Sequence, residues 1–250
     1  MSVVVVDDDG AVVTVRLNRP EVLNALNVAL LEELVAALRT VRHRPAVVLE
    51  GEGRAFCVGE DLNESLAPRT GGAAELRASF ALLQETTRLI TASEGVVIAA
   101  VHGYAIGGGA ELALAADLVI AAPAARVRFP EVSLGHAVTG GISARLPAIV
   151  GLLRAKELLL TSRWVDGAEA LALGLVNELV DEPGARARDL AAAIAAHPQR
   201  SVAATKRGLE LANIPHQESV LAAEVEAATY CFAADEASRS LDDFRASHRR

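Results

Sequence analysis

The sequence predicts an α/β fold, because strand-like segments alternate with helix-like segments as far as about Glu131. The clearest strand is the uncharged run 96–101, which is typical of a strand buried on both faces of a sheet. A triple glycine at 107–109 and the helix formers of 110–116 follow, so strand, sharp turn and helix come in succession. After Glu131 nearly every segment has a helical pattern, which predicts a helical region behind the α/β core.

The N-terminal elements are predicted from turn and cap signals. Residues 3–6 and 11–17 are expected to form a β-hairpin, because the Asp-Gly pair at 9–10 is a turn signal. Asn27 is the expected N-cap of a helix over 28–41, in which leucines recur at helical spacing. A buried strand is then predicted at 46–50 and a glycine-rich passage at 51–59.

The remaining elements are predicted from composition and from the glycines and prolines that interrupt helices and strands. The polar, turn-rich segment after Leu62, as far as Gly72, is interpreted as a mobile loop over a ligand, with a solvated connector as the alternative. A helix over about 73–90 follows it, and a strand-like run covers 127–130. Helices are further predicted at 141–149, 154–161, 167–173, 185–196, 199–213, 217–232 and 235–247.

Composition excludes several classes of function. A net charge of −8 argues against a nucleic-acid partner and against a general membrane-surface role, since both need a positive field. The N-terminus has no basic region of the kind that signal peptides carry, and no uninterrupted apolar run is long enough to span a bilayer. Cys57 and Cys231 lack C-x-x-C spacing and are interpreted as reduced thiols. A cytoplasmic protein is therefore expected.

The triple glycine has two interpretations. It is either a close packing point between strand and helix or a bare-backbone site, where the unpaired N–H groups of a helix start favour negative charge. Neither G-x-G-x-x-G nor G-x-x-x-x-G-K-[ST] is present at this turn, so the usual kinds of phosphate site are unsupported. Glu111 lies in the first turn of the predicted helix, and Glu131 follows twenty positions later.

Several motifs, in the right order, resemble the enoyl-CoA hydratase/isomerase family, also called the crotonase family. They are LNRP with NAL in the region 17–26, GRAFCVGEDL at 53–62, IAAVHGYAIGGGAELALAADLVIA at 98–121, FPEVSLG at 129–135 and LGLVN at 173–177. The resemblance implies a crotonase-like ββα spiral core over residues 1–195 and a C-terminal helical trimerisation region over 196–250. It also implies a homotrimer or a dimer of trimers.

The resemblance implies chemistry on a thioester. The backbone N–H groups of Glu60 and Gly108 would donate to the thioester oxygen, each contributing roughly 3 kcal/mol of transition-state stabilisation. Only backbone is needed at these positions, so the Glu60 side chain is expected to point away from the site.

Glu111 and Glu131 occupy the family's acid/base positions, where each step typically contributes ~10²–10⁴-fold. Two carboxylates facing one water would repel, so the pair is expected to titrate together with one pKa shifted upward. Taken alone, Glu111 is also explained as an acidic residue that the helix dipole favours at a helix start. Taken alone, Glu131 is also explained as a surface charge after a proline. Hydratases of the family carry a glutamate at both positions and its isomerases commonly keep one, so the resemblance favours an enoyl-CoA hydratase. An enoyl-CoA isomerase with Glu131 as proton shuttle, and a non-catalytic binding protein including an RNA binder, remain as alternatives.

The family resemblance also implies contacts with the coenzyme A portion of an acyl-CoA substrate, with no permanently bound cofactor and no metal. Arginines are candidates because the CoA phosphates need local positive charge on an acidic protein. The candidate contact residues are Arg19, Leu23, Asn24, Ala25, Arg54, Gly59, Asp61, Leu62, Gly107, Phe244 and Arg245.

The segment after Glu131 departs from the family pattern G-x-x-P-x-x-G-G. Val138 stands in place of the proline and Ile142 in place of a glycine. His136, in the same segment, is either an acid or base in the acyl pocket or a simply hydrogen-bonded side chain. Nearer the C-terminus, Arg239-Ser240 replaces the family's Glu-Gly pair. The acyl specificity therefore does not follow from the resemblance.

Overall fold

The computed structural model describes residues 2–62, 64 and 73–232 of the chain. Phe244, Arg245, the predicted helix at 235–247 and nearly all of the proposed loop before residue 73 lie outside the described residues. The described part is built on a six-stranded sheet with the order β1-β2-β3-β4-β6-β9. Within it β1 and β2 are antiparallel, and the other neighbouring pairs are parallel. The strands are β1 Val4–Asp8, β2 Val12–Leu17, β3 Ala46–Gly51, β4 Val96–Val101, β6 Leu118–Ala121 and β9 Glu178–Leu179.

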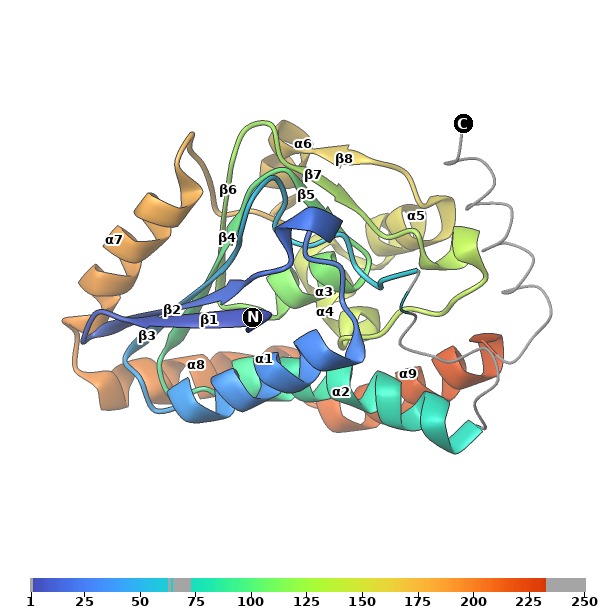
Figure 1. Cartoon of the computed structure of the whole chain (residues 1–250), viewed down its shortest axis with the longest axis horizontal. Coiled ribbons are helices and arrows are strands. Elements are labelled where there is room, and N and C mark those ends of the chain that lie inside the picture. The colour runs from blue at the N-terminus through green and yellow to red at the C-terminus, as the bar shows by residue number, and fades with distance from the viewer. Residues whose placement is uncertain (1, 63, 65–72, 233–250) are drawn as a thin grey trace.

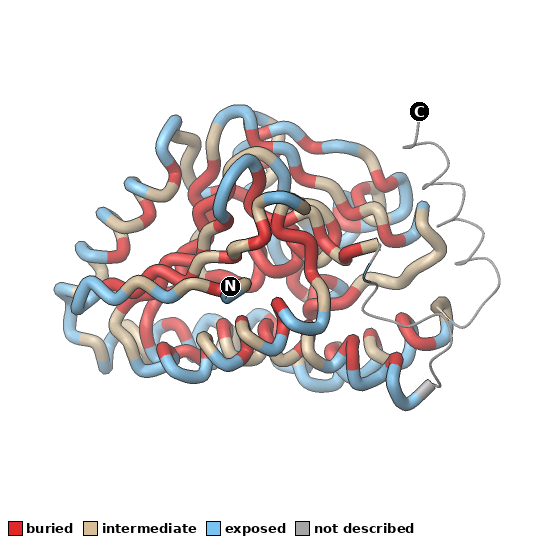
Figure 2. The backbone as a smooth tube through the Cα atoms, in the orientation of Figure 1, coloured by how far each residue is buried: buried red, intermediate tan, exposed pale blue. Residues whose placement is uncertain are grey.

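Helices cover both faces of this sheet, and the alternation of side chains along β3 shows how. Ala46 and Val48 pack with the alanines of α7 (Pro183–Ala195), whereas Val47 and Leu49 pack with the leucines of α1 (Val28–Val41) and with α3 (Gly108–Ala115). Successive side chains of a strand point to opposite faces, so a strand between two helical layers is apolar throughout. In Figure 1 α7 and α1 lie on opposite sides of the strands, and Figure 2 shows the buried residues concentrated between them.

A second sheet of three short strands joins the first near the triple glycine. Its order is β5-β7-β8, with strands β5 Tyr104–Ile106, β7 Arg126–Arg128 and β8 Val165–Asp166. β5 and β7 are parallel, and their polypeptide continues directly into α3 and into the short helix η2 (Glu131–Leu134). The pairing of β5 with β7 therefore brings the segments that carry Glu111 and Glu131 together.

The rest of the described chain is mainly helical. α9 (Gln217–Phe232) lies along α2 (Ala73–Thr91), as Figure 1 shows, and ion pairs join Arg77 to Glu226 and Arg88 to Glu218. The other elements are η1 Pro20–Val22, α4 Ile142–Val150, α5 Leu152–Thr161, α6 Gly167–Leu173 and α8 Gln199–Asn213.

Most predicted elements are confirmed, and the differences have physical reasons. The helices at 28–41, 167–173, 199–213 and 217–232 and the strand at 96–101 have the predicted bounds. Asn27 caps α1 as expected, since its Oδ1 accepts a hydrogen bond from Leu30 N at 2.9 Å. The region after Glu131 also contains β8 and β9, which the prediction missed. Both are only two residues long and depend on pairing with distant strands, so they leave no periodic pattern in the sequence.

Candidate active site

The segment from Cys57 to Asp61 is held between two others by backbone hydrogen bonds. Leu26 N donates to Gly59 O at 2.7 Å and Asp61 N donates to Leu26 O at 2.9 Å. On the other side, Ile106 N donates to Cys57 O at 3.0 Å. Gly59 has a positive φ of 81°, and a Cβ there would lie 2.6 Å from Ile106 O and 3.3 Å from the backbone nitrogen of Gly108. The absence of a side chain on Gly59 thus lets the two proposed donor segments lie against each other.

The structure shows close packing at the triple glycine, and it leaves the bare-backbone interpretation as a prediction. A Cβ on Gly109 would lie 2.3 Å from Cys57 O, so this glycine is a close packing point. A Cβ on Gly107, whose φ is +53°, would lie 2.8 Å from Glu131 Oε1, so this glycine leaves room beside a carboxylate. Gly108 is the first residue of α3, where the N–H has no acceptor within the helix. The turn therefore combines close packing with a backbone N–H, that of Gly108, which has no acceptor within the helix.

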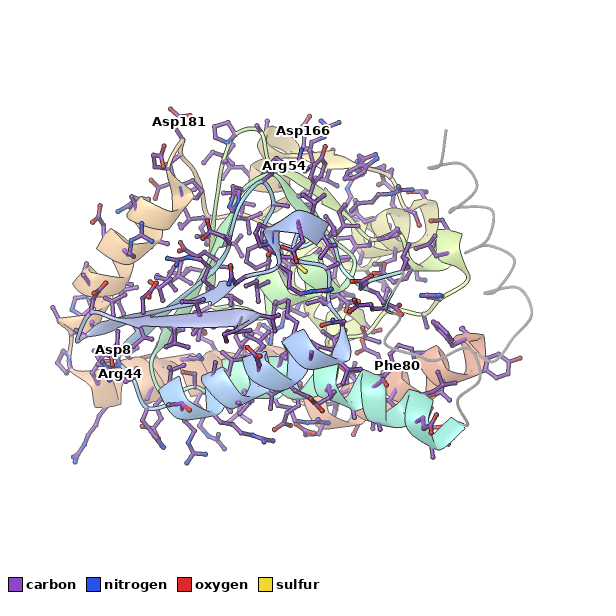
Figure 3. All side chains as sticks on the ribbon, in the orientation of Figure 1. Asp8, Arg44, Arg54, Phe80, Asp166 and Asp181 are labelled. Atoms are coloured by element: carbon purple, nitrogen blue, oxygen red, sulfur yellow. The ribbon has the colours of Figure 1, made fainter. Side chains whose placement is uncertain are left out.

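These segments line a cavity of about 540 Å³. Glu60, Gly108 and Glu131 all contribute to its wall. Phe80 and Arg54, both labelled in Figure 3, come from α2 and from the loop after β3, and both also line it. Of the remaining candidates, the residues that line the cavity are Leu23, Ala25, Gly59, Asp61, Leu62 and Gly107.

Glu111 is buried next to this cavity, with 1% of its surface exposed. Its carboxylate accepts two hydrogen bonds from Thr139, from the backbone N–H at 2.8 Å and from the hydroxyl at 2.6 Å. Burial, followed by the negative charge of Glu131, raises the pKa of Glu111 well above its usual value, and the Thr139 bonds oppose that rise. Thr139 also lines the cavity. Thr139 was not among the residues predicted from the sequence, although it lies between the two departures from the family pattern at Val138 and Ile142.

Glu131 is the first residue of η2 and is 8% exposed. Its Oε2 is buried and has no hydrogen-bond partner among the described residues. Burial raises the pKa of Glu131 to about 7, and a hydrogen bond from its own backbone N–H and the positive charge of Arg128 oppose that rise. A buried oxygen without a partner costs free energy and is typical of a position that water or a substrate group fills.

Together the two glutamates form a pair suited to proton transfer. Burial raises the pKa of both carboxyl groups, and the negative charge of Glu131 raises that of Glu111 further, so the arrangement favours a proton on one member of the pair. One member can then accept a proton while the other donates one. Backbone donors beside the same cavity would stabilise an oxyanion that forms during such a transfer.

His136 and Glu60 meet at the wall of the same cavity. His136 Nδ1 lies 3.7 Å from Glu60 Oε2, and the imidazole ring packs on Phe232 with the centroids 4.8 Å apart. The Glu60 side chain was expected to point away from the site, but its carboxylate lies next to this cavity-lining histidine. Burial lowers the pKa of His136 to about 4, so the ring is neutral at pH 7. Its Nε2 has no hydrogen-bond partner among the described residues, so the simply hydrogen-bonded interpretation is not supported.

Arg19 and Asn24 have roles other than lining the cavity. The Arg19 guanidinium is buried and donates to Asp61 Oδ2 at 2.9 Å and to the carbonyl of Ala25 at 2.7 Å. Asn24 is completely buried, and its side chain bonds to the backbone of Arg19, Glu52 and Ala55. These bonds hold the loop that bears Leu23 and Ala25. Arg19 was a candidate for a CoA phosphate, and the structure instead engages it in an internal ion pair.

Two side chains at the cavity wall were not anticipated. Trp164 is 40% exposed, and the Arg128 guanidinium lies 5.3 Å from the centroid of its indole ring. Both residues line the cavity with Arg54. They belong to β7 and to the loop before β8, and only the three-stranded sheet brings them together.

A larger cavity of about 820 Å³ lies under α8, away from the glutamate pair. It contains the buried ion pair between Lys206 and Asp117, and its wall includes neither Glu111 nor Glu131. Within the described residues no cluster of His, Cys, Asp and Glu side chains is suited to a metal ion. No helix in that part of the chain has the length and apolarity needed to cross a membrane.

Residues 7–248 match the family model described as Enoyl-CoA hydratase/isomerase. The short-chain-enoyl-CoA hydratase of Clostridium acetobutylicum is 33% identical over 247 residues, which cover 96% of this chain and 94% of that protein. A probable enoyl-CoA hydratase of Rhodobacter capsulatus is 41% identical over 205 residues, 79% of this chain and 76% of that protein.

Solved structures agree with these relatives. An enoyl-CoA hydratase/isomerase from Mycobacterium paratuberculosis has a TM-score of 0.91 at 29% identity, with 97% of this chain and 98% of that chain covered. An enoyl-CoA hydratase from Bacillus halodurans has a TM-score of 0.90 at 26% identity, with 97% and 100% covered. The crotonase-like α/β fold implied by the sequence motifs is thus confirmed.

Proposed function

This chain belongs to the enoyl-CoA hydratase/isomerase family, and from that premise we propose that it adds water to a trans-2-enoyl-CoA to give a 3-hydroxyacyl-CoA. The observation that carries the proposal is the buried pair Glu111 and Glu131 beside the two backbone donor segments at Gly59-Glu60 and Gly107-Gly108. A hydratase needs one group to activate water and another to protonate Cα, and this pair supplies both.

In the proposed reaction the thioester oxygen accepts hydrogen bonds from the N–H groups of Glu60 and Gly108. These bonds draw electron density from the conjugated double bond, so Cβ becomes electrophilic. The ionised member of the glutamate pair takes a proton from water as its oxygen attacks Cβ. The protonated member gives its proton to Cα, and the charge on the thioester oxygen returns to the carbonyl form. The pair ends with one proton, as it began.

The test is the loss of enoyl absorbance when purified protein is mixed with crotonyl-CoA. We expect turnover by the wild type and at least ~10²-fold lower kcat in Glu111→Gln and in Glu131→Gln, because each substitution removes an acid/base group. Glu94→Gln, a surface change, serves as the matched control and should retain activity. Absence of turnover with enoyl thioesters of several chain lengths, or turnover indifferent to both substitutions, contradicts the hydratase proposal.

An enoyl-CoA isomerase is the second candidate, and one observation favours it. Thr139 donates a hydrogen bond to each carboxylate oxygen of Glu111, whereas Glu131 Oε2 has no hydrogen-bond partner among the described residues. In an isomerase Glu131 alone would move a proton between two carbons. Product analysis on 2-enoyl and 3-enoyl thioesters separates the two reactions, since isomerisation yields no hydroxyacyl product. Failure of both reactions leaves a non-catalytic binding protein.

We further propose that coenzyme A enters only as part of the substrate and that no cofactor is permanently bound. We also propose that the protein is cytoplasmic.

We propose, finally, that the protein is a homotrimer or a dimer of trimers. In this assembly residues 196–250 form the trimerisation region, and residues 1–195 form the core. Exposed leucines support self-association, because large apolar surfaces are typical of interfaces. They are Leu152, Leu153, Leu160, Leu209 and Leu211. Light scattering should give a trimer or hexamer mass, and Leu209→Glu, on α8 within residues 196–250, should lower it.

A further inference from the structure

We infer that Glu224, on α9, is a positioning residue for Glu111, because it fixes the start of α4 and with it the turn that holds the Glu111 carboxylate. The inference rests on the proposed function for its kinetic readout, but not for its spectroscopic one. Glu224 does not line the cavity, and nothing in the sequence singles it out.

The Glu224 carboxylate accepts three hydrogen bonds. It is 4% exposed, and its Oε2 accepts hydrogen bonds from Gly141 N at 2.8 Å and from Gln84 Nε2 at 3.0 Å. Its Oε1 accepts a bond from Ser143 N at 2.9 Å. Gly141 is the N-cap of α4, so the carboxylate binds the N–H groups that a helix start leaves without acceptors. A side chain from the C-terminal region thereby caps a helix of the core.

The residues next to this cap, Gly140 and Thr139, contact Glu111. Gly140, next to the capped residue, packs so closely that a Cβ on it would lie 2.7 Å from Glu111 Cβ. Its carbonyl accepts a hydrogen bond from the Thr87 hydroxyl at 3.0 Å. Thr139, one residue earlier, makes both hydrogen bonds to the Glu111 carboxylate. The turn 139–141 is therefore fixed at one end by Glu224 and holds Glu111 at the other.

Glu224 also acts on Glu111 through its negative charge. The charged groups that face Glu111 are Glu131 from η2 and Glu224 from α9, and the negative charge of each raises the pKa of Glu111. The other acidic residues nearby on α9, Glu218 and Glu226, are exposed and paired with arginines of α2. Glu224 thus keeps a proton on Glu111 to higher pH, in addition to fixing the geometry.

The side-chain chemistry at position 224 is specific. Two oxygens face three N–H donors, so a glutamine of the same shape would place an NH₂ group against a donor and would remove the charge. Aspartate keeps the charge and both acceptors on a shorter side chain. The two substitutions therefore separate the effect of the negative charge at position 224 from the effect of the length of the side chain.

The experiment compares wild type, Glu224→Gln, Glu224→Asp and the matched control Glu226→Gln on the same helix. Carbon NMR of glutamate-labelled protein follows the titration of the Glu111 carboxyl, assigned with Glu111→Gln. We expect Glu224→Gln to lower the titration midpoint by at least ~0.5 pH units, because a like charge is removed. Glu224→Asp and Glu226→Gln should keep the wild-type midpoint.

Kinetics with the enoyl thioester give the second readout. Glu224→Gln should lower kcat roughly 10-fold with KM within about twofold, because Glu111 is misplaced while the CoA contacts remain. Glu224→Asp should retain more of the wild-type kcat than Glu224→Gln does, and Glu226→Gln should keep the full wild-type kcat. If the wild type turns over no enoyl thioester, the proposed reaction fails, and the NMR shift still decides the role of Glu224.

Gln84→Leu covers the case in which Glu224→Gln does not fold. It removes one donor to Glu224 without changing charge, so the negative charge is less compensated and the Glu111 midpoint should rise. A folded Glu224→Gln with the wild-type midpoint and kcat, or a wild-type midpoint in Gln84→Leu when Glu224→Gln is unfolded, overturns the inference.

Discussion

Thr139 donates two hydrogen bonds to Glu111, one from its backbone and one from its hydroxyl, while the neighbouring Glu131 has a buried oxygen with no partner among the described residues. The two carboxylates are thus placed in unequal surroundings, although both are buried. In a pair that shares a proton, such inequality decides which member is held in place and which is open to water or substrate.

Replacement of Thr139 by valine tests the hydroxyl bond. Thr139→Val keeps the shape and the backbone bond but removes the donor at 2.6 Å, so the pKa of Glu111 should rise further. We expect a ~10–100-fold loss of kcat, which corresponds to about 1.5–3 kcal/mol, the value of a hydrogen bond to a charged group. Stopped-flow hydration assays measure it. Thr139→Ser retains the hydroxyl and should stay within about threefold of wild type, and equal losses in both variants would speak against the bond.

The pKa of Glu131 makes a prediction about stability and pH. Its pKa is about 7 in the folded protein, against an ordinary value of 4.5, so between these pH values the folded state keeps a proton that the unfolded state loses. Stability must then fall as pH rises through this window. Glu131→Gln removes that penalty and should gain ~2–4 kcal/mol over wild type on going from pH 4 to pH 8. Urea unfolding at both pH values measures it, and a constant difference would show that Glu131 has an ordinary pKa.

Substitution of Gly107 tests the room beside Glu131. The φ of Gly107 is +53°, and a Cβ would lie 2.8 Å from Glu131 Oε1. Gly107→Ala should therefore displace the carboxylate and lower kcat by ~10²-fold, since small displacements at a reacting group are costly. Gly10→Ala is the matched control, because Gly10 also has a positive φ, of 85°, but has nothing within 4 Å of its Cβ position. If both variants lose the same stability and neither loses activity, glycine is needed at position 107 only for its positive φ and not for room beside Glu131.

The buried ion pair of Arg19 and Asp61 predicts a large loss of stability. Arg19→Ala leaves Asp61 buried without its arginine and should cost ~3–5 kcal/mol in urea unfolding. Arg44→Ala removes an exposed pair with Asp8, labelled in Figure 3, and should cost at most about 1 kcal/mol. A stable Arg19→Ala with a raised KM for the CoA thioester would instead restore Arg19 as a phosphate contact.

The sequence by itself determined the family, the central strand, the triple-glycine turn and the positions of Glu111 and Glu131. These features are local: a buried strand needs an uncharged run, and a close backbone approach needs glycine whatever the rest of the chain does. The helices that match their predicted bounds begin or end at local signals such as Asn27 and Pro198.

Only the tertiary structure decided which side chains surround the two glutamates. Thr139 lies 28 residues from Glu111 in sequence, and Gly141 lies 83 residues from Glu224, so no periodicity or spacing links them. The same holds for Arg19, which looks like a free loop cation until Asp61 is placed beside it. The pKa of each glutamate follows from burial and from charges brought near by folding, and those quantities exist only once distant elements have packed together.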